Sequence, residues 1–349
     1  MKFRPKSKLR IMVLLSQQLL PPDKIEEGVD KEKQPWRTEF DVVSTLRSMG
    51  HEVSIVGMAS DLAVIQKVRN EFQPHIAFNL LEDFDGNALF DQHVVSYLEL
   101  LGQPYTGCNP RGLTLARDKA LTKKILSYHR IAVPGFAVFP RGQKVVRPKR
   151  LAFPILVKSL SEEGSVGISQ ASVVNDDQKL AERVEFIHRT TETTALAEQY
   201  VEGREIYVSV IGNRNLQTYT PWELIIKNLP DGSLNIATGR AKWNVDYQKK
   251  VGLVTKPADL SAEQQVKLKL LSKRIYRLLD LSGYARLDYR LDNNGEFYLL
   301  EANPNPQIAR NEDFSDSAAH CGVSYAPLLQ KILTLGLSYK AAERIITRR

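Results

Sequence analysis

The stretch 284–303 contains the residues whose types and spacing best fit a chemical role. Two runs of alternating, β-favouring residues flank the dipeptide Asn294-Gly295, which favours a type I′ turn with a two-residue loop. The stretch therefore predicts a β-hairpin. Such a loop fixes the pairing of the two strands, so that Asp288 faces Glu301 across the hairpin.

One side of this hairpin would carry groups that bind a metal and an anion. The same pairing puts Arg286 opposite Asn303, on the side that holds Asp288 and Glu301. Two carboxylates and an amide oxygen suit Mg²⁺, which takes such oxygens together with phosphate oxygens. On these residues alone, a charged face in solvent is the alternative. The other side is apolar enough to be the core face, and its expected members are Ala285, Leu287, Tyr289, Leu291, Tyr298, Leu300 and Ala302.

The composition is that of a folded globular protein of two or three domains. The chain has 349 residues, of which 43% are hydrophobic and 25% charged. The net charge is +8, but Lys and Arg are scattered without interleaved aromatic residues, so we expect no nucleic-acid partner. Two distant cysteines, Cys108 and Cys321, fit a reducing cytoplasm. The apolar run 11–15 is too short for a secretion signal, and we expect no membrane contact.

The first part of the chain alternates between strand and helix patterns. Strands are expected at 9–15, 52–56 and 75–80, and helices at 38–49, 61–72 and 91–101. This order is typical of a parallel sheet with helices on both faces, whose ligands gather at the carboxyl ends of the strands. Two loops leave those ends, a long insert at 16–37 and an acidic loop at 81–87. The acidic loop suits either a cationic amine or an ordinary surface turn.

Two further units follow, and the first has signals for phosphate. Asp118 can cap a helix whose first turn holds Lys119, where a bound anion would offset the unfavourable helix dipole. A strand ends in Lys158 and leads into a Gly/Ser loop. This loop could bind phosphates through its backbone N–H groups and hydroxyls, or it could be an ordinary flexible loop between two strands. A long helix is expected from the capping box at Ser261 to about residue 281. We expect an N-terminal Rossmann-like substrate domain at 1–117, a central lobe at 118–200, a C-terminal lobe with the Mg²⁺ site at 201–340 and a basic tail at 341–349.

In this order the stretches resemble the ATP-grasp superfamily and, within it, the D-alanine–D-alanine ligases. The resemblance is collinear from about 78 to 333. Its pieces are Asn79-Leu-Leu81, Leu98 to Gly107, Asp118 to Lys123, Val157-Lys158 with Glu163 to Gly167, Glu198 to Glu205, Ala241-Lys242, Arg286-x-Asp288 and Leu300 to Asn303. The resemblance implies an α/β protein with α+β lobes, in which an ATP-grasp fold follows an N-terminal Rossmann-like parallel-sheet domain.

The resemblance assigns residues to ATP, to Mg²⁺ and to catalysis. Lys119 and Lys158 look like the pair that contacts the phosphates of ATP. The segment that lines the adenine pocket holds Glu198, Gln199 and Val201, and Glu205 resembles the ribose-binding carboxylate. Asp288, Glu301 and Asn303 match the family's Mg²⁺ ligands, and the same ligands could also bind Mn²⁺. The catalytic set comprises Arg286 as the residue that stabilises the oxyanion, Ser165 in the flap over the phosphates and Lys242 in the loop that helps close the site.

The departures from the family concentrate on the substrate side. The family's Gly-rich loop with Ser and Glu is missing from 16–37, so Glu39, or Glu26 or Glu27 in the insert, could hold the substrate amine instead. The family's His-Gly is replaced by Glu82-Asp83. Trp243 stands where those enzymes commonly have tyrosine, and the backbone N–H that helps bind the oxyanion would belong to Gln307.

The resemblance implies an ATP-dependent ligase that joins a carboxylate to an amine through an acyl phosphate and releases ADP and phosphate, and these residues fit that chemistry. Because the expected substrate-binding residues differ from the family pattern, we expect small-molecule substrates other than two D-alanines. The acids Glu82, Asp83, Glu312 and Asp313 favour a substrate with a cationic or additional amine group. The alternatives are a true D-alanine–D-alanine ligase, a ligase that adds amino acids to a peptide, and a non-catalytic ATP-binding protein. A homodimer is compatible with all of these.

Overall fold

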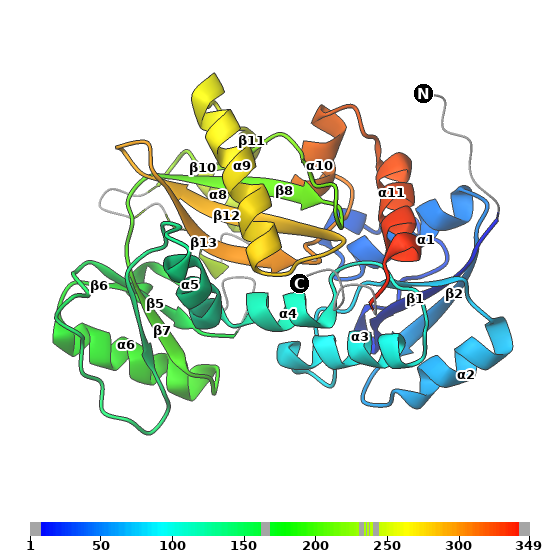
Figure 1. Ribbon diagram of the computed structural model, residues 1–349, viewed down its shortest axis with the longest axis horizontal. Helices are drawn as coiled ribbons and strands as arrows, with labels where there is room; N and C mark the ends of the chain where they lie inside the picture. The colour runs from blue at the N-terminus through cyan, green and yellow to red at the C-terminus, as the bar shows by residue number, and fades with distance from the viewer. Residues whose placement is uncertain are drawn as a thin grey trace.

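The computed structural model describes residues 8–161, 168–229, 234, 236, 238–239 and 244–341, which form three β-sheets and the helices around them (Figure 1). Ser165, Lys242, Trp243 and all of the expected basic tail except residue 341 lie outside the described residues. No helix within these described ranges is long and apolar enough to cross a membrane.

The N-terminal sheet is parallel, as the alternating pattern predicts. Its strands β1 (Arg10–Ser16), β2 (Glu52–Met58) and β3 (Ile76–Asn79) lie in the order β2-β1-β3. Successive β1 residues point to opposite faces, and all five central ones are fully buried. Helices α2 (Ala63–Phe72) and α3 (Asp91–Leu100) pack with Met12 and Leu14, whereas α1 (Arg37–Ser48) packs with Ile11 and Val13.

The helices at the C-terminal end return to this N-terminal sheet, which the sequence pattern did not indicate. Helix α10 (Asp313–His320) and helix α11 (Tyr325–Ser338) share the core on the α1 face of the sheet, through Phe314, Leu328 and Ile332. Figure 1 shows α11 beside α1. The loop that precedes α10 is therefore held close to the start of α1.

The central sheet is antiparallel, with strand order β4-β7-β5-β6. Its strands are β4 (Phe136–Phe139), β5 (Ile155–Ser159), β6 (Val173–Val174) and β7 (Ala195–Gln199). Helix α6 (Asp177–Thr190) buries Leu180, Val184 and Ile187 against this sheet, and helices α4 (Pro110–Arg117) and α5 (Lys119–Tyr128) lead into it. Figure 1 shows α6 on one side of the sheet, away from β12 and β13.

The third sheet carries the hairpin and has the strand order β11-β10-β8-β12-β13, with β9 paired to β8. Its strands are β8 (Arg204–Ile211), β9 (Gln217–Thr218), β10 (Trp222–Ile226), β11 (Leu253–Pro257), β12 (Tyr284–Leu291) and β13 (Phe297–Pro304), and the short helix α8 (Val245–Val251) precedes β11. Helix α9 (Ala262–Leu278) covers the sheet. The expected capping box is present, because Ser261 accepts from the N–H of Gln264 and Gln264 from that of Ser261.

The hairpin pairs Asp288 with Glu301 and Arg286 with Asn303, as expected, but its loop is not the expected two-residue turn. The N–H of Asp292 donates to the carbonyl of Glu296, so three residues form the loop, with Gly295 at φ 82°. A three-residue loop that ends in a left-handed glycine is a common hairpin alternative. The prediction of a two-residue type I′ turn was therefore wrong.

A β-bulge restores the pairing at the site end of the hairpin. The register shifts between Asp288 and Tyr289, where Leu300 is the extra residue. On the loop side of the bulge, Phe297 and Leu299 are therefore the buried residues. The expectation that Tyr298 and Leu300 lie on the core face was wrong, because one extra residue reverses the alternation.

Candidate active site

Lys119 joins the central lobe to the hairpin. Asp118 caps α5 by accepting from the N–H of Leu121 at 2.8 Å, which places Lys119 in the first turn. Its ammonium lies 3.0 Å from Oε1 of Glu301, and the residue is only 4% exposed. The positive start of a helix and a buried lysine together form an environment for an anion.

A buried group of three charges lies behind this contact. Glu198 on β7 lies between Lys123 and Lys158, each ammonium 3.2 Å from a different carboxylate oxygen. Burial alone would raise the pKa of Glu198, but the two ammonium groups outweigh burial and lower it. Burial would lower the pKa of Lys158, yet Glu198 and Glu301 raise it. Burial lowers the pKa of Lys123, although Glu198 opposes that shift. Glu198 and Lys158 therefore form an ionised pair inside the protein.

Lys123 was not among the expected site residues. It lies one helical turn after Lys119 on α5, on the same face, which is the signal that could have identified it. Its ammonium donates to the carbonyls of Leu299 and Leu300 at 3.4 and 3.2 Å. Lys123 thus connects Glu198 to the bulge of the hairpin.

Arg286 and Asp288 form a bidentate ion pair on the hairpin. Nε and Nη2 of Arg286 donate to the two oxygens of Asp288 at 2.8 and 2.9 Å. The side-chain amide of Asn303 donates to Oδ2 of Asp288 at 2.9 Å. The guanidinium lies over the ring of Tyr207 at 4.5 Å, and its Nη1 is 3.7 Å from Asp313. Burial would lower the pKa of Arg286, but Asp288 raises it, so this group is a permanent cation.

The oxygen donors on the hairpin fit a hard divalent cation in kind and placement. Asp288 and Glu301 face each other in register, with Asn303 two residues beyond Glu301 on the same side. Arg286 and Lys119 now neutralise the two carboxylates. In the described part of the chain no group of three or more His, Cys, Asp or Glu side chains is placed to hold a metal ion, and Asn303 adds an amide oxygen to the two carboxylates of the hairpin.

The expected ribose and adenine residues lie on β7, β8 and the segment between them. Glu205 is buried, and its two oxygens accept from Tyr207 at 2.8 Å and from Arg290 at 3.1 Å. Gln199 is exposed and Val201 is half-buried. Glu198, in contrast, directs its carboxylate to the two lysines.

Three of the four expected substrate residues line one cavity. Glu39, Glu82 and Gln307 surround a space of about 20 Å³, together with Thr38 and others. Glu82 is exposed, whereas Glu39 is 4% exposed and its Oε2 has no hydrogen-bond partner among the described residues. Burial, with the charge of Glu82 adding to it, raises the pKa of Glu39 to about 7.

Of the three acids expected as alternatives for the substrate amine, Glu39 lines the cavity. Glu26 and Glu27 are exposed and do not line it. Gln307 contributes through its side chain, whose Nε2 donates to Oγ1 of Thr38 at 3.1 Å.

The three-sheet fold, with lysines and carboxylates meeting between the central sheet and the hairpin, defines a ligase of the ATP-grasp type. A family model described as D-ala D-ala ligase C-terminus matches residues 125–334. The chain belongs to the D-alanine–D-alanine ligase family of ATP-grasp proteins.

Individual relatives support this membership over most of the chain. A D-alanine–D-alanine ligase of Syntrophotalea carbinolica is 32% identical over 302 residues, covering 85% of this chain and 89% of its own. An uncharacterized protein of Sinorhizobium fredii, y4sG, is 29% identical over 310 residues, covering 86% and 88%. The crystal structure of the Bacillus anthracis D-alanine–D-alanine ligase complexed with ATP has a TM-score of 0.73 at 23% identity, covering 94% of this chain and 97% of that one, and so shares the fold.

These findings confirm the expected fold class, family and reaction class, which is that of an ATP-dependent, ADP-forming carboxylate–amine ligase.

Proposed function

We propose that this enzyme joins the carboxylate of one small molecule to the amine of another, and that at least one of them is not D-alanine. The observation that supports this most is the buried carboxylate of Glu39, which faces a small cavity with a second acid, Glu82, at its exposed side. A carboxylate buried without a cation is unfavourable, and a bound ammonium group would relieve that cost. A cavity of about 20 Å³ has room for a group the size of one water molecule.

In this proposal the nucleotide binds between the central sheet and the hairpin. Lys119 and Lys158 hold its phosphates, the segment with Glu198, Gln199 and Val201 lies along adenine, and Glu205 holds the ribose. The buried pairing of Lys158 with Glu198 keeps that lysine charged and fixed in place, which supports its role.

Asp288, Glu301 and Asn303 would hold Mg²⁺, or Mn²⁺ in its place, with phosphate oxygens and water completing the coordination. The metal would neutralise charge on the transferring phosphoryl group. The present pairing of both carboxylates with cations supports a site built for positive charge.

The proposed reaction has two steps. A carboxylate oxygen attacks the γ-phosphorus of ATP, the bond to the bridging oxygen breaks, and ADP leaves. The amine nitrogen then attacks the carbonyl carbon of the acyl phosphate, the carbon–oxygen bond to phosphate breaks, and the nitrogen loses a proton. Arg286 would donate to the oxygen that becomes negative in the tetrahedral state. The backbone N–H of Gln307 would assist, and the roles of Ser165, Lys242 and Trp243 stay predictions.

The test is a coupled assay of ADP release with D-alanine alone, and with D-alanine, L-lysine and putrescine in every pair. We expect strong ADP release only when a compound with a second amine is present. Glu39→Gln should raise the KM of that compound, and Glu301→Ala should abolish turnover. Strong turnover with D-alanine alone would overturn the proposal in favour of a D-alanine–D-alanine ligase, the name that several relatives carry.

If wild type binds ATP but no pair gives acceptor-dependent ADP, the non-catalytic alternative is favoured. A cytoplasmic location and a homodimer belong to the same proposal. Cys108 and Cys321 are not joined by a disulfide, which supports a reducing compartment.

A further inference from the structure

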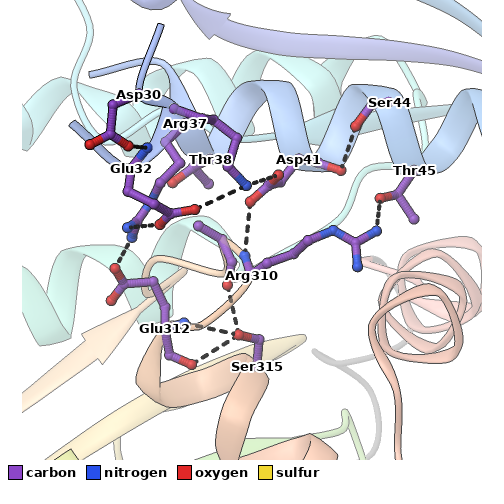
Figure 2. Close-up of polar contacts among 12 residues, drawn as sticks. Asp30, Glu32, Arg37, Thr38, Asp41, Ser44, Thr45, Arg310, Glu312 and Ser315 are labelled. Carbon is purple, nitrogen blue, oxygen red and sulfur yellow. Dashed lines mark hydrogen bonds and ion pairs between the residues drawn. The ribbon is translucent and has the colours of Figure 1, made fainter. Parts of the chain in front are cut away.

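Asp41 connects three segments that are far apart in the sequence. It lies in the second turn of α1 and is 2% exposed. Its Oδ1 accepts from the ammonium of Lys31 in the insert at 2.8 Å, and its Oδ2 accepts from the backbone N–H of Arg310 at 3.0 Å. One buried carboxylate thus holds the insert and the loop before α10 onto the same helix (Figure 2).

Further contacts hold the same segments together. Arg37 donates to Glu32 of the insert at 2.8 Å and pairs with Glu312 of the loop. Arg310 donates to Oγ1 of Thr45 at 2.9 Å, one turn beyond Asp41. Figure 2 shows Arg37 and Arg310 on either side of Asp41. The loop is therefore fixed at several points along α1.

The loop that these contacts hold reaches both the cavity and Arg286. Thr38 and Glu39 of α1 line the cavity from one side, and the loop from Asn305 to Ile308 lines it from the other. At the other end of the loop, Asp313 lies 3.7 Å from Arg286. The position of one short segment thus affects both the Glu39 cavity and the guanidinium beside Asp288.

We propose that Lys31, Arg37, Asp41, Arg310 and Glu312 form a clamp, called here the α1 clamp, that positions the loop 305–313 for the reaction. Its members are positioning residues, because they act through the loop. The clamp makes the insert part of the substrate site, and it keeps the Glu39 cavity small. The proposal rests on the proposed function for its substrate, and on the contacts alone for its structural part.

Hydrogen–deuterium exchange of the protein without ligand tests the structural part. In Asp41→Asn the side chain keeps its shape but replaces one acceptor oxygen by an N–H₂ group. We expect faster exchange in 305–313, including the N–H of Arg310, and unchanged exchange in the central sheet. Unchanged exchange in 305–313 would overturn the clamp, as would an equal increase throughout the chain.

Kinetics tests the functional part, using the substrate pair that the ADP-release assay selects. Asp41→Asn should lower kcat/KM for the compound with two amines about tenfold or more, because small displacements at a site cost rate. The KM for ATP should stay within about twofold of wild type. An equal effect on the KM for ATP would show general structural damage instead. If no pair releases ADP, the proposed function fails, while the exchange result still decides the clamp.

A double-mutant cycle tests the pair Arg37–Glu312 within the clamp. If the two residues act together, Arg37→Met with Glu312→Gln should lower kcat/KM no more than the stronger single change. Multiplicative effects would remove this pair from the clamp. Arg47→Met is the matched control, because Arg47 also joins α1 to the insert, through an exposed pair with Asp23 at 2.9 Å. We expect it to have no effect.

Discussion

Replacing Lys123 by methionine should weaken metal binding by the hairpin without touching any expected metal ligand. The ammonium of Lys123 donates to the carbonyls of Leu299 and Leu300, and Leu300 is the extra residue of the bulge. That bulge sets which way the next residue, Glu301, faces. Methionine keeps much of the length of the side chain but removes its charge and its donors.

The magnitude follows from what each group loses. Buried carbonyls that lose their donor cost about 1–3 kcal/mol each. Glu198 keeps Lys158 as its second cation, so the full cost of an isolated buried charge does not arise. We expect a loss of about 3 kcal/mol in the free energy of unfolding. Loss of a residue that orients a metal ligand typically weakens metal affinity about 10–100-fold.

Metal affinity is measured by electron paramagnetic resonance of Mn²⁺ in the presence of ADP, and the Mg²⁺ dependence of ATP turnover gives a second readout. Lys124→Met is the matched control, because Lys124 is the exposed neighbour on the same helix. We expect Lys123→Met to raise the Mn²⁺ dissociation constant at least about tenfold and the control to leave it unchanged. A folded Lys123→Met variant with the Mn²⁺ affinity of wild type would refute this reasoning.

Three further predictions concern the substrate cavity, catalysis and stability. Because the pKa of Glu39 is raised to about 7, the free energy of unfolding of the wild type falls as the pH rises from about 4.5 to 7. Glu39→Gln should therefore be about 3 kcal/mol more stable than wild type at pH 8 and equal to it near pH 4.5. Urea unfolding at the two pH values measures this difference. In Arg286→Lys the lysine cannot reproduce the bidentate contact with Asp288. Steady-state kinetics should show kcat about 100-fold lower, with little change in the KM for ATP. Gly107→Ala should lose about 2 kcal/mol in thermal unfolding, because Gly107 has φ 94° and a Cβ would clash with the side chain of Asn305.

The hairpin shows what alternation in a sequence can and cannot predict. Pairing of Asp288 with Glu301 was confirmed, although the loop was longer than expected. The longer loop shifts the strands by one residue, and the bulge at Leu300 shifts them back. Because the carbonyls at this bulge accept from Lys123, 177 residues away from Leu300, its position depends on tertiary contacts rather than on local preference.

The substrate side was less predictable because its residues meet through long-range contacts. From the sequence, Glu39, Glu26 and Glu27 were alternatives for binding the substrate amine, and the packing of α1 against the loop at Gln307 is what places Glu39 at a cavity. The return of α10 and α11 to the N-terminal sheet creates that packing. No local pattern in 309–313 indicates a partner that lies about 270 residues earlier in the chain.

The two halves of the proposed site are therefore held in physically different ways. In the proposed nucleotide half, β-strand register and buried lysine–carboxylate pairs fix the groups, and a single substitution there removes one partner of a buried charge. In the substrate half, the insert and the loop 305–313 are joined to α1 by side-chain contacts that are partly exposed. Such contacts can be exchanged at lower cost in stability. We therefore expect a change of substrate to involve new partners for Asp41 and Glu39 rather than a new fold.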